Sequence, residues 1–436
     1  MRAHERDALL IATAFVAALL LMLPALASAA PDSIVTVEDN ESTPGYPAVA
    51  LDEHGSPHLV WQDSATGRMT SAWLDPASGH IAGPRVLNGD SPGIATIPTP
   101  RIVSSGSRLF VAWIDCCTVA AIAQSSDGGA TFTTPLSAPA ETPADVDIAA
   151  DSAGTLYVVW REVLYPGAGA VAFSTLPSGS STFSPRQILQ PSDARSPAIA
   201  VAGSKVYVAW GGANGSVMLN LSVDGGRSFL PAIPVDTTAS WFPMTPRLVA
   251  TATRLFAVWA SSGGNATVPR FATSTDGRNF SAPVDLDWGF GGADPQPTLA
   301  LGGGGSVYAA WSSVGLSAES STGILRVRKA DANGSNWQDV TTYSEPGTGL
   351  IHAGLAVDAH GHYFLVHDRM LHEMQTVYQV RLVTDLAFPW EPDTRFVAIV
   401  AILGVAVAVL GVAASVLLRP RRKSGTGEPE PVPGRR

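Results

Sequence analysis

Four acidic side chains follow aromatic strand ends in a way that suits acid–base chemistry. Asp63, Asp115 and Glu162 each stand two residues after a tryptophan, and Asp368 directly follows a histidine in an equivalent pattern. Glycosidic bonds are hydrolysed by two carboxyl groups placed several ångströms apart. These four residues are therefore the candidates for catalysis, and the sequence cannot supply their separations.

Aromatic, basic and acidic residues in the neighbouring loops suit ligand binding. Rings can stack on a sugar, and aromatics and arginines anchor protein partners. The alternative for each residue is ordinary packing, because large aromatics are often buried. The binding-face candidates are Arg161, Tyr165, Arg195, Trp241, Trp288, Asp294 and Arg369, with His352 and His367 on the same side.

A repeating strand pair must position these residues. A proline-led apolar strand, a turn rich in Gly, Asp and Ser, and an aliphatic-aromatic strand ending in Trp recur about every 50 residues. The chain has 42 Gly and 33 Pro, a composition that favours short strands and turns over helices. The repeats end at Trp61, Trp113, Trp160, Trp210, Trp259, Trp311 and, with His replacing Trp, His367.

This period predicts an all-β fold, a seven-bladed β-propeller of four-stranded blades over residues 32–385. The seventh copy lacks a fourth strand, while residues 34–38 form an extra strand before the first copy. We expect that N-terminal strand to complete the last blade and remove an exposed sheet edge. Turns of an antiparallel meander alternate between strand ends, so the loops after each Trp and those before each proline-led strand share one face, here called the loop face.

A second motif, Ser-x-Asp-x-Gly-x-[Thr/Ser]-Phe, lies on the opposite face. Its chemistry is structural: the carboxylate and hydroxyl cap turn amides, Gly takes a positive φ, and the aromatic anchors the turn. A third copy is one residue short, and residues 331–337 form a distorted fourth. The motif residues are Ser125, Asp127, Gly129 and Phe132; Ser222, Asp224, Gly226 and Phe229; and Ser274, Asp276 and Phe280.

These motifs resemble the Asp-box (BNR) repeats of sialidase-like β-propellers. The resemblance covers fold and repeats from residue 34 to about 385, and implies a glycosidase with an arginine cluster, a tyrosine nucleophile activated by glutamate, and an aspartate acid/base. The active-site motifs do not carry over. The family's Arg-Ile-Pro signature would stand where this chain has Gly45-Tyr46-Pro47-Ala48, and Pro100-Arg101-Ile102 has another order. Known sialidase propellers also have six blades.

Both chain ends carry membrane-targeting signals. Residues 1–29 read as a cleaved signal peptide, with an uncleaved anchor as the alternative. After a linker at 386–395, residues 396–418 contain no charge and predict a transmembrane helix, with a buried core helix as the alternative. The basic Pro-rich tail at 419–436 predicts a cytoplasmic C-terminus by the positive-inside rule. We therefore expect a single-pass type I protein of the cell membrane, with its propeller outside.

The net charge, the two cysteines and the histidines indicate which ligands and cofactors the protein can bind. The formal net charge of −10 argues against nucleic acid. Cys116 and Cys117 are adjacent in an exported chain, which leaves a vicinal disulfide, free thiols or an intermolecular bridge open. The histidines near residues 352–372 favour solvated side chains over a metal site, so we expect no metal and no cofactor.

Together these patterns predict a cell-surface propeller that binds an extracellular glycan or protein ligand through its loop face. The competing function is an exo-acting, sialidase-like glycoside hydrolase acting on extracellular glycans.

Overall fold

The computed structural model describes residues 33–386, with gaps at 41–43, 64–65, 90–98, 116–118, 164–168, 238–244, 264–265, 288–295, 318–319, 346–351 and 373–375. Met1–Phe388 forms one compact unit, and Pro389–Arg436 is a second unit outside the described residues. Among the described residues, no helix is both long and apolar enough to cross a bilayer. The predicted signal peptide, the linker beyond residue 386, the transmembrane helix and the tail fall outside them.

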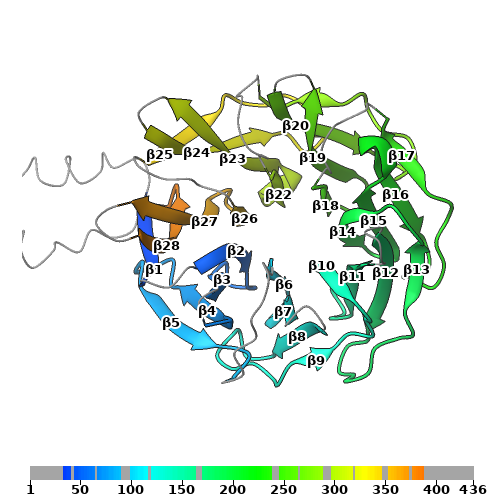
Figure 1. Cartoon of the computed structure of the whole chain (residues 1–436), viewed down its shortest axis with the longest axis horizontal. Helices are drawn as coiled ribbons and strands as arrows, with labels where there is room; N and C mark the ends of the chain where they lie inside the picture. Colours follow the sequence, from blue (N-terminus) through cyan, green and yellow to red (C-terminus); the bar gives the residue numbers. More distant parts are fainter. Residues whose placement is uncertain are drawn as a thin grey trace, which may run out of the picture. The chain divides into compact units, whose positions relative to one another are not determined.

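Seven four-stranded antiparallel sheets surround a common axis, as Figure 1 shows, so the predicted seven-bladed propeller is confirmed. Blade 1 contains β2 (Pro44–Leu51), β3 (Pro57–Asp63), β4 (Arg68–Leu74) and β5 (Ile81–Val86). Blade 2 contains β6 (Arg101–Ser105), β7 (Arg108–Asp115), β8 (Val119–Ser125) and β9 (Leu136–Ser137). Blade 3 contains β10 (Pro143–Ala150), β11 (Leu156–Val163), β12 (Gly169–Leu176) and β13 (Gln187–Gln190). Blade 4 contains β14 (Arg195–Ala202), β15 (Lys205–Gly211), β16 (Val217–Ser222) and β17 (Ile233–Asp236).

The remaining blades follow the same order from the axis outward. Blade 5 contains β18 (Arg247–Ala250), β19 (Leu255–Gly263), β20 (Ala266–Ser274) and β21 (Val284–Asp285). Blade 6 contains β22 (Thr298–Leu301), β23 (Val307–Ser317), β24 (Ser320–Ala330) and β25 (Thr341–Glu345). Blade 7 contains β26 (Ala353–Val357), β27 (Tyr363–His372), β28 (Thr376–Thr384) and β1 (Ser33–Asn40). Two short 3₁₀ turns lie in connections between described strands: η1 (Ala213–Gly215) joins β15 to β16, and η2 (Gly303–Gly305) joins β22 to β23.

The N-terminal strand closes the ring as predicted. β1 pairs antiparallel with β28, from Ser33 opposite Thr384 to Asn40 opposite Tyr378. The first and last described strands therefore share one sheet, which covers the outer edge of β28.

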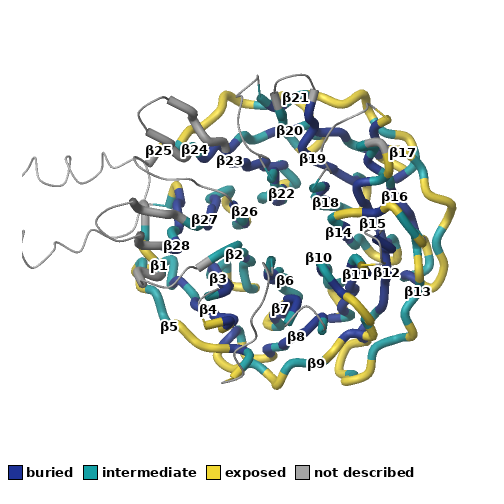
Figure 2. Tube along the Cα trace, viewed as in Figure 1, coloured by how far each residue is buried: buried dark blue, intermediate teal, exposed yellow. Residues whose placement is uncertain are grey.

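The core is divided among the blade interfaces. Each of seven apolar clusters draws its residues from two neighbouring blades, including the pair formed by blades 7 and 1. Figure 2 shows buried residues concentrated on the middle strands, with exposed residues on the outer strands and turns. The six repeat tryptophans are each at most 1% exposed, and His367 takes the equivalent position in blade 7 at 0%. Each sheet packs an apolar face against the blade on either side, so each repeat of the sequence adds one blade and one apolar interface.

Candidate functional site

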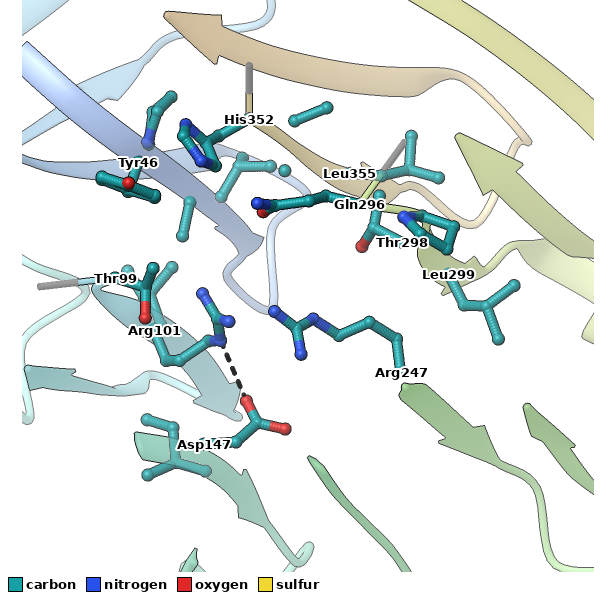
Figure 3. Close-up of a pocket in the computed structure, with 18 of the residues that line it drawn as sticks. Tyr46, Thr99, Arg101, Asp147, Arg247, Gln296, Thr298, Leu299, His352 and Leu355 are labelled. Carbon is teal, nitrogen blue, oxygen red and sulfur yellow. Dashed lines mark ion pairs between the residues drawn. The ribbon is translucent and has the colours of Figure 1, made fainter. Parts of the chain in front are cut away.

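A cavity of about 190 Å³ opens on the axis at the N-terminal ends of the innermost strands, which is the loop face. Figure 3 shows its lining, which comes from several blades. Two positions of the repeat supply most of the polar groups. The residues directly before the strand proline contribute Tyr46, Thr99 and Gln296, and those directly after it contribute Arg101, Arg247 and Thr298. In the two blades without this proline, Asp147 follows Val146 in blade 3 and His352 precedes Ala353 in blade 7.

Backbone strain directs two of these side chains. Tyr46 has φ 56° and Gln296 has φ 34°, and both precede proline, as does Ser196 with φ 46°. The register of β2 against β3 shifts between Gly45 and Ala48, and that of β14 shifts between Arg195 and Ala198. A bulge of this kind re-aims a side chain, and non-glycine residues at positive φ concentrate at functional sites. The strained entry to the inner strand thus forms the cavity rim.

Two arginines give the cavity its charge. The guanidinium groups of Arg101 and Arg247 both point toward the middle of the cavity in Figure 3. In each, Nη1 donates a hydrogen bond of 3.0 Å to the carbonyl of the preceding proline, so the two blades hold their guanidinium groups in the same way. Asp147 Oδ1 lies 3.2 Å from Arg101 Nε, and its Oδ2 accepts a 3.0 Å hydrogen bond from the Ile199 amide. Among the described lining residues there are therefore two arginines and one carboxylate.

An aromatic pair forms another part of the wall. The Tyr46 and His352 rings lie 3.6 Å apart between centroids. Asp368 Oδ1 accepts from the His352 amide at 3.1 Å, and its Oδ2 lies 3.3 Å from His352 Nδ1. Burial, with a smaller contribution from the negative charge of Asp368, raises the pKa of the Tyr46 hydroxyl above 10.0. Tyr46 therefore keeps its proton at neutral pH and can donate a hydrogen bond to a ligand.

The four candidate acids occupy different surroundings. Asp368 supports His352 behind the cavity wall, as described above. Asp63, at the end of β3, accepts hydrogen bonds from the amide and hydroxyl of Thr66. Asp115 ends β7 and is partly buried. Neither of these two residues belongs to the lining of the axial cavity.

Glu162 is held inside blade 3 by three donors. Its Oε1 accepts from Trp160 Nε1 at 3.1 Å, Arg186 Nη1 at 2.8 Å and the Glu141 amide at 3.3 Å. A similar arrangement surrounds Trp311 of blade 6. There Asp287 accepts hydrogen bonds from Trp311 Nε1 at 3.0 Å and from Arg326 Nη1 at 2.7 Å. A buried carboxylate that satisfies a core tryptophan and an arginine has a packing role.

The remaining binding-face candidates divide into three groups. Arg161 Nε pairs with Asp145 at 2.8 Å, and Arg195 is exposed at the start of β14. Arg369 lies in β27, where only its backbone is described. Tyr165, Trp241, Trp288, Asp294, Cys116 and Cys117 lie outside the described residues.

The Asp-box residues form turns that clamp neighbouring blades. In the first box, Asp127 accepts from the Thr131 hydroxyl at 2.6 Å and amide at 2.8 Å, while Ser125 Oγ accepts from the Gly129 amide at 2.8 Å. The second and third boxes repeat this network around Asp224 and Asp276, with an Asn279 amide and side chain replacing the hydroxyl donor in the third. In the second box the Phe229 ring packs edge-on against Phe173 of blade 3 at 5.1 Å.

Three lining residues that were not among the predicted site residues carry a recognisable signal in the sequence. Arg101, Asp147 and Arg247 put a charge immediately inside an otherwise apolar strand. The innermost strand of a propeller blade faces the axis, so a charge at this position points to the axial cavity. Tyr46 and Gln296 carry no such signal in the sequence; the structure shows both in the lining, with positive φ.

A second hollow, of about 390 Å³, lies on the Asp-box face between blades 1 and 2. Its lining includes Trp73, Arg85, His54, Glu53 and Asp127. Many of its polar groups already form hydrogen bonds within their own turns, as Asp127 does with Thr131. The axial cavity, with converging charged groups from several blades, is the better candidate for a ligand site.

No protein-family model and no curated protein matches the chain. Among solved structures, an ulvan lyase of polysaccharide lyase family PL25 superposes with a TM-score of 0.50 at 10% identity, over 80% of this chain and 95% of that one. A protein of unknown function from Dyadobacter fermentans gives 0.49 at 13% identity, covering 81% and 99%. The phage phi92 endosialidase gives 0.47 at 10% identity, covering 84% and 70%. At 10% identity the likeness to the ulvan lyase bears on the fold alone, and no family model for the Asp-box repeat matches.

Proposed function

We propose that this protein binds an acidic sugar residue of an extracellular glycan in the axial cavity. The observation that carries the proposal is the convergence of Arg101 and Arg247 on one small polar hollow. Planar guanidinium groups recognise carboxylate and sulfate-like oxygens through paired, charge-assisted hydrogen bonds. Asp147 lies 3.2 Å from Arg101 and offsets part of its positive charge.

The other lining groups match a sugar ring. The Tyr46–His352 pair offers an aromatic surface to an apolar sugar face, while Gln296, Thr99 and Thr298 offer donors and acceptors for hydroxyl groups. The cavity of about 190 Å³ is smaller than the roughly 300–1,000 Å³ typical of pockets for drug-sized ligands. A single sugar residue fits this volume better than an extended chain does.

The protein's acidic net charge does not oppose this local recognition. Charges farther than a Debye length, about 8 Å at physiological ionic strength, are largely screened. The two arginines would lie within hydrogen-bond distance of a bound anion. Their attraction for the anion therefore outweighs the repulsion from the distant acidic residues. The proposed ligand class rests on the residues that line the cavity and not on the structural similarity to the ulvan lyase.

The test compares methyl glucuronide with methyl glucoside, which differ by a carboxylate, by isothermal titration calorimetry. The chain supplies matched variants: Arg101→Ala copies Ala198 at the same repeat position in blade 4, and Arg247→Thr copies Thr298 in blade 6. Each should weaken glucuronide binding by roughly 10- to 100-fold, since a charged hydrogen bond contributes about 1.5–3 kcal/mol. Arg195→Ala, on the same face outside the lining, should bind as the wild type does.

Equal binding of the two glycosides, or wild-type affinity in both arginine variants, would refute the acidic-sugar proposal. Release of a new reducing end from an acidic oligosaccharide would instead support the hydrolase function.

We also propose that residues 396–418 anchor the propeller outside the cell, as the uncharged run and its basic flank suggest. In fractionated cells the full chain should stay with membranes after alkaline carbonate washing. Release into the wash would rule out a spanning anchor.

A further inference from the structure

A turn of blade 7 brings together three metal-ligating side chains. Asp358, His360 and His362 place one ligand atom each within 4.8 Å of one another. They lie in the connection between β26 and β27, on the Asp-box face and thus at the opposite strand ends from the axial cavity. We propose that these three residues form a Zn²⁺ site.

The ligand atoms are already close to zinc geometry. Asp358 Oδ2 lies 2.9 Å from His362 Nδ1 and 3.8 Å from His360 Nδ1. Ligand atoms about 2.0–2.1 Å from a tetrahedral Zn²⁺ are roughly 3.4 Å apart, between these two separations. A Zn²⁺ ion bound to these atoms would replace the Asp358–His362 hydrogen bond by two metal bonds to nitrogen and one to oxygen.

The turn holds the carboxylate in place without using the oxygen that the metal needs. Asp358 Oδ1 accepts from the amides of His360 and His362, both at 2.8 Å, and Oδ2 faces the imidazoles. The turn thus fixes one carboxylate oxygen, while the other oxygen is directed at the two histidines.

Blade 6 fixes the turn from the side. The Tyr308 hydroxyl donates to the Gly361 carbonyl at 2.9 Å, and the Gly303 amide donates to the Asp358 carbonyl at 3.3 Å. Lys329 is the nearby cation: its ammonium lies over the Tyr308 ring at 5.2 Å from the centroid. The His360 side chain is 83% exposed and that of His362 is 38% exposed, so a metal ion and a solvent ligand in the fourth position can reach the site.

Two other blades contain the same turn without the site. In blade 1, Asp52 caps the amides of His54 and Ser56, both at 2.9 Å. In blade 3, Asp151 caps those of Ala153 and Thr155, at 3.0 and 2.8 Å. The turn therefore folds with Ser at the second histidine position and with Ala at the first, and the paired histidines are not needed for its backbone.

These turns supply the variants for the test. His360→Ala copies blade 3 and should leave the thermal midpoint without metal nearly unchanged. His362→Ser copies blade 1 and should lower that midpoint slightly, because it removes the hydrogen bond between Asp358 Oδ2 and His362. Calorimetric titration of tag-free full-length protein with ZnCl₂ should show one equivalent bound, with affinity at least about tenfold weaker in each variant. His54→Ala, which removes an exposed histidine from another turn, should titrate as the wild type does.

Two further readouts make the outcome decisive. Zn²⁺ should raise the thermal midpoint of the wild type, a chelator should reverse the rise, and MgCl₂ should produce neither effect. Absence of saturable binding at one equivalent, or wild-type binding by both turn variants, would overturn the site. Neither result bears on sugar binding, because the arginines act at the other end of the strands.

Discussion

At the residue scale, the same chemical group serves different purposes according to its neighbours. Glu162 and Asp368 both follow the repeat's last aromatic position, yet Glu162 accepts from Trp160 and Arg186 inside a blade, whereas Asp368 contacts His352 on the cavity wall. The repeat predicted a strand end for both carboxylates, which is right for Glu162 in β11 but wrong for Asp368, because β27 continues to His372. Arg186 and His352 lie 24 and 16 residues away along the chain, so only the folded chain distinguishes the roles of the two carboxylates.

The pH dependence of stability tests the role of Asp127. Hydrogen bonds from the Thr131 hydroxyl and amide, followed by that from Ser125, lower its pKa from 3.8 to about 2. Because the folded pKa lies below the unfolded one, this carboxylate stabilises the fold above about pH 4 and loses that effect as the pH falls toward 2. Asp127→Asn should therefore be less stable at pH 7 and show a flatter pH dependence between 4 and 2.

Thermal unfolding at pH 7, 4 and 2.5 measures this difference. Asp193→Asn is the control, an exposed carboxylate outside the boxes whose positive φ asparagine also tolerates. A variant at Asp127 that tracks the wild type at all three pH values would contradict the capping role.

At the scale of elements, the Asp-box is a device for joining blades. The second-box glycine, Gly226, has φ 83°, and a Cβ there would lie 2.6 Å from the Phe173 ring of blade 3. Gly277 and Gly334 approach Tyr207 and Phe271 of their preceding blades in the same way, at 2.6 and 2.8 Å. Glycine is thus required at this position for two reasons: it adopts the positive φ of the turn, and it leaves room for the aromatic ring of the preceding blade.

A pair of alanine variants separates these two effects. Gly226→Ala should lower the free energy of unfolding by about 2–4 kcal/mol, because it adds overpacking against Phe173 to the strain of positive φ. Gly179→Ala, at φ 75° with nothing within 4 Å, should cost only the strain, about 1–2 kcal/mol. Chemical denaturation measures both, and equal losses would mean that the contact with Phe173 is unimportant.

At the scale of the whole molecule, ring closure depends on one strand. β1 completes blade 7 by pairing with β28, and without it the edge of β28 is open. A protein lacking residues 1–40 should unfold roughly 10 °C or more below one lacking residues 1–32, and should self-associate through the open edge. Scanning calorimetry and size-exclusion chromatography check both expectations; a monomer with an unchanged midpoint would show that closure by β1 is dispensable.

The sequence by itself determined the architecture, since the Trp-ended strand pairs, their spacing of about 50 residues and the unmatched N-terminal strand are periodic features that local chemistry encodes. The membrane segments and the identity of the ligand stay predictions. Tertiary structure alone decided where the site is: Tyr46, Arg101, Arg247, Gln296 and His352 come from five different blades and meet because each inner strand begins at the same axis. Convergence about an axis is a property of the closed ring, and no single repeat contains it.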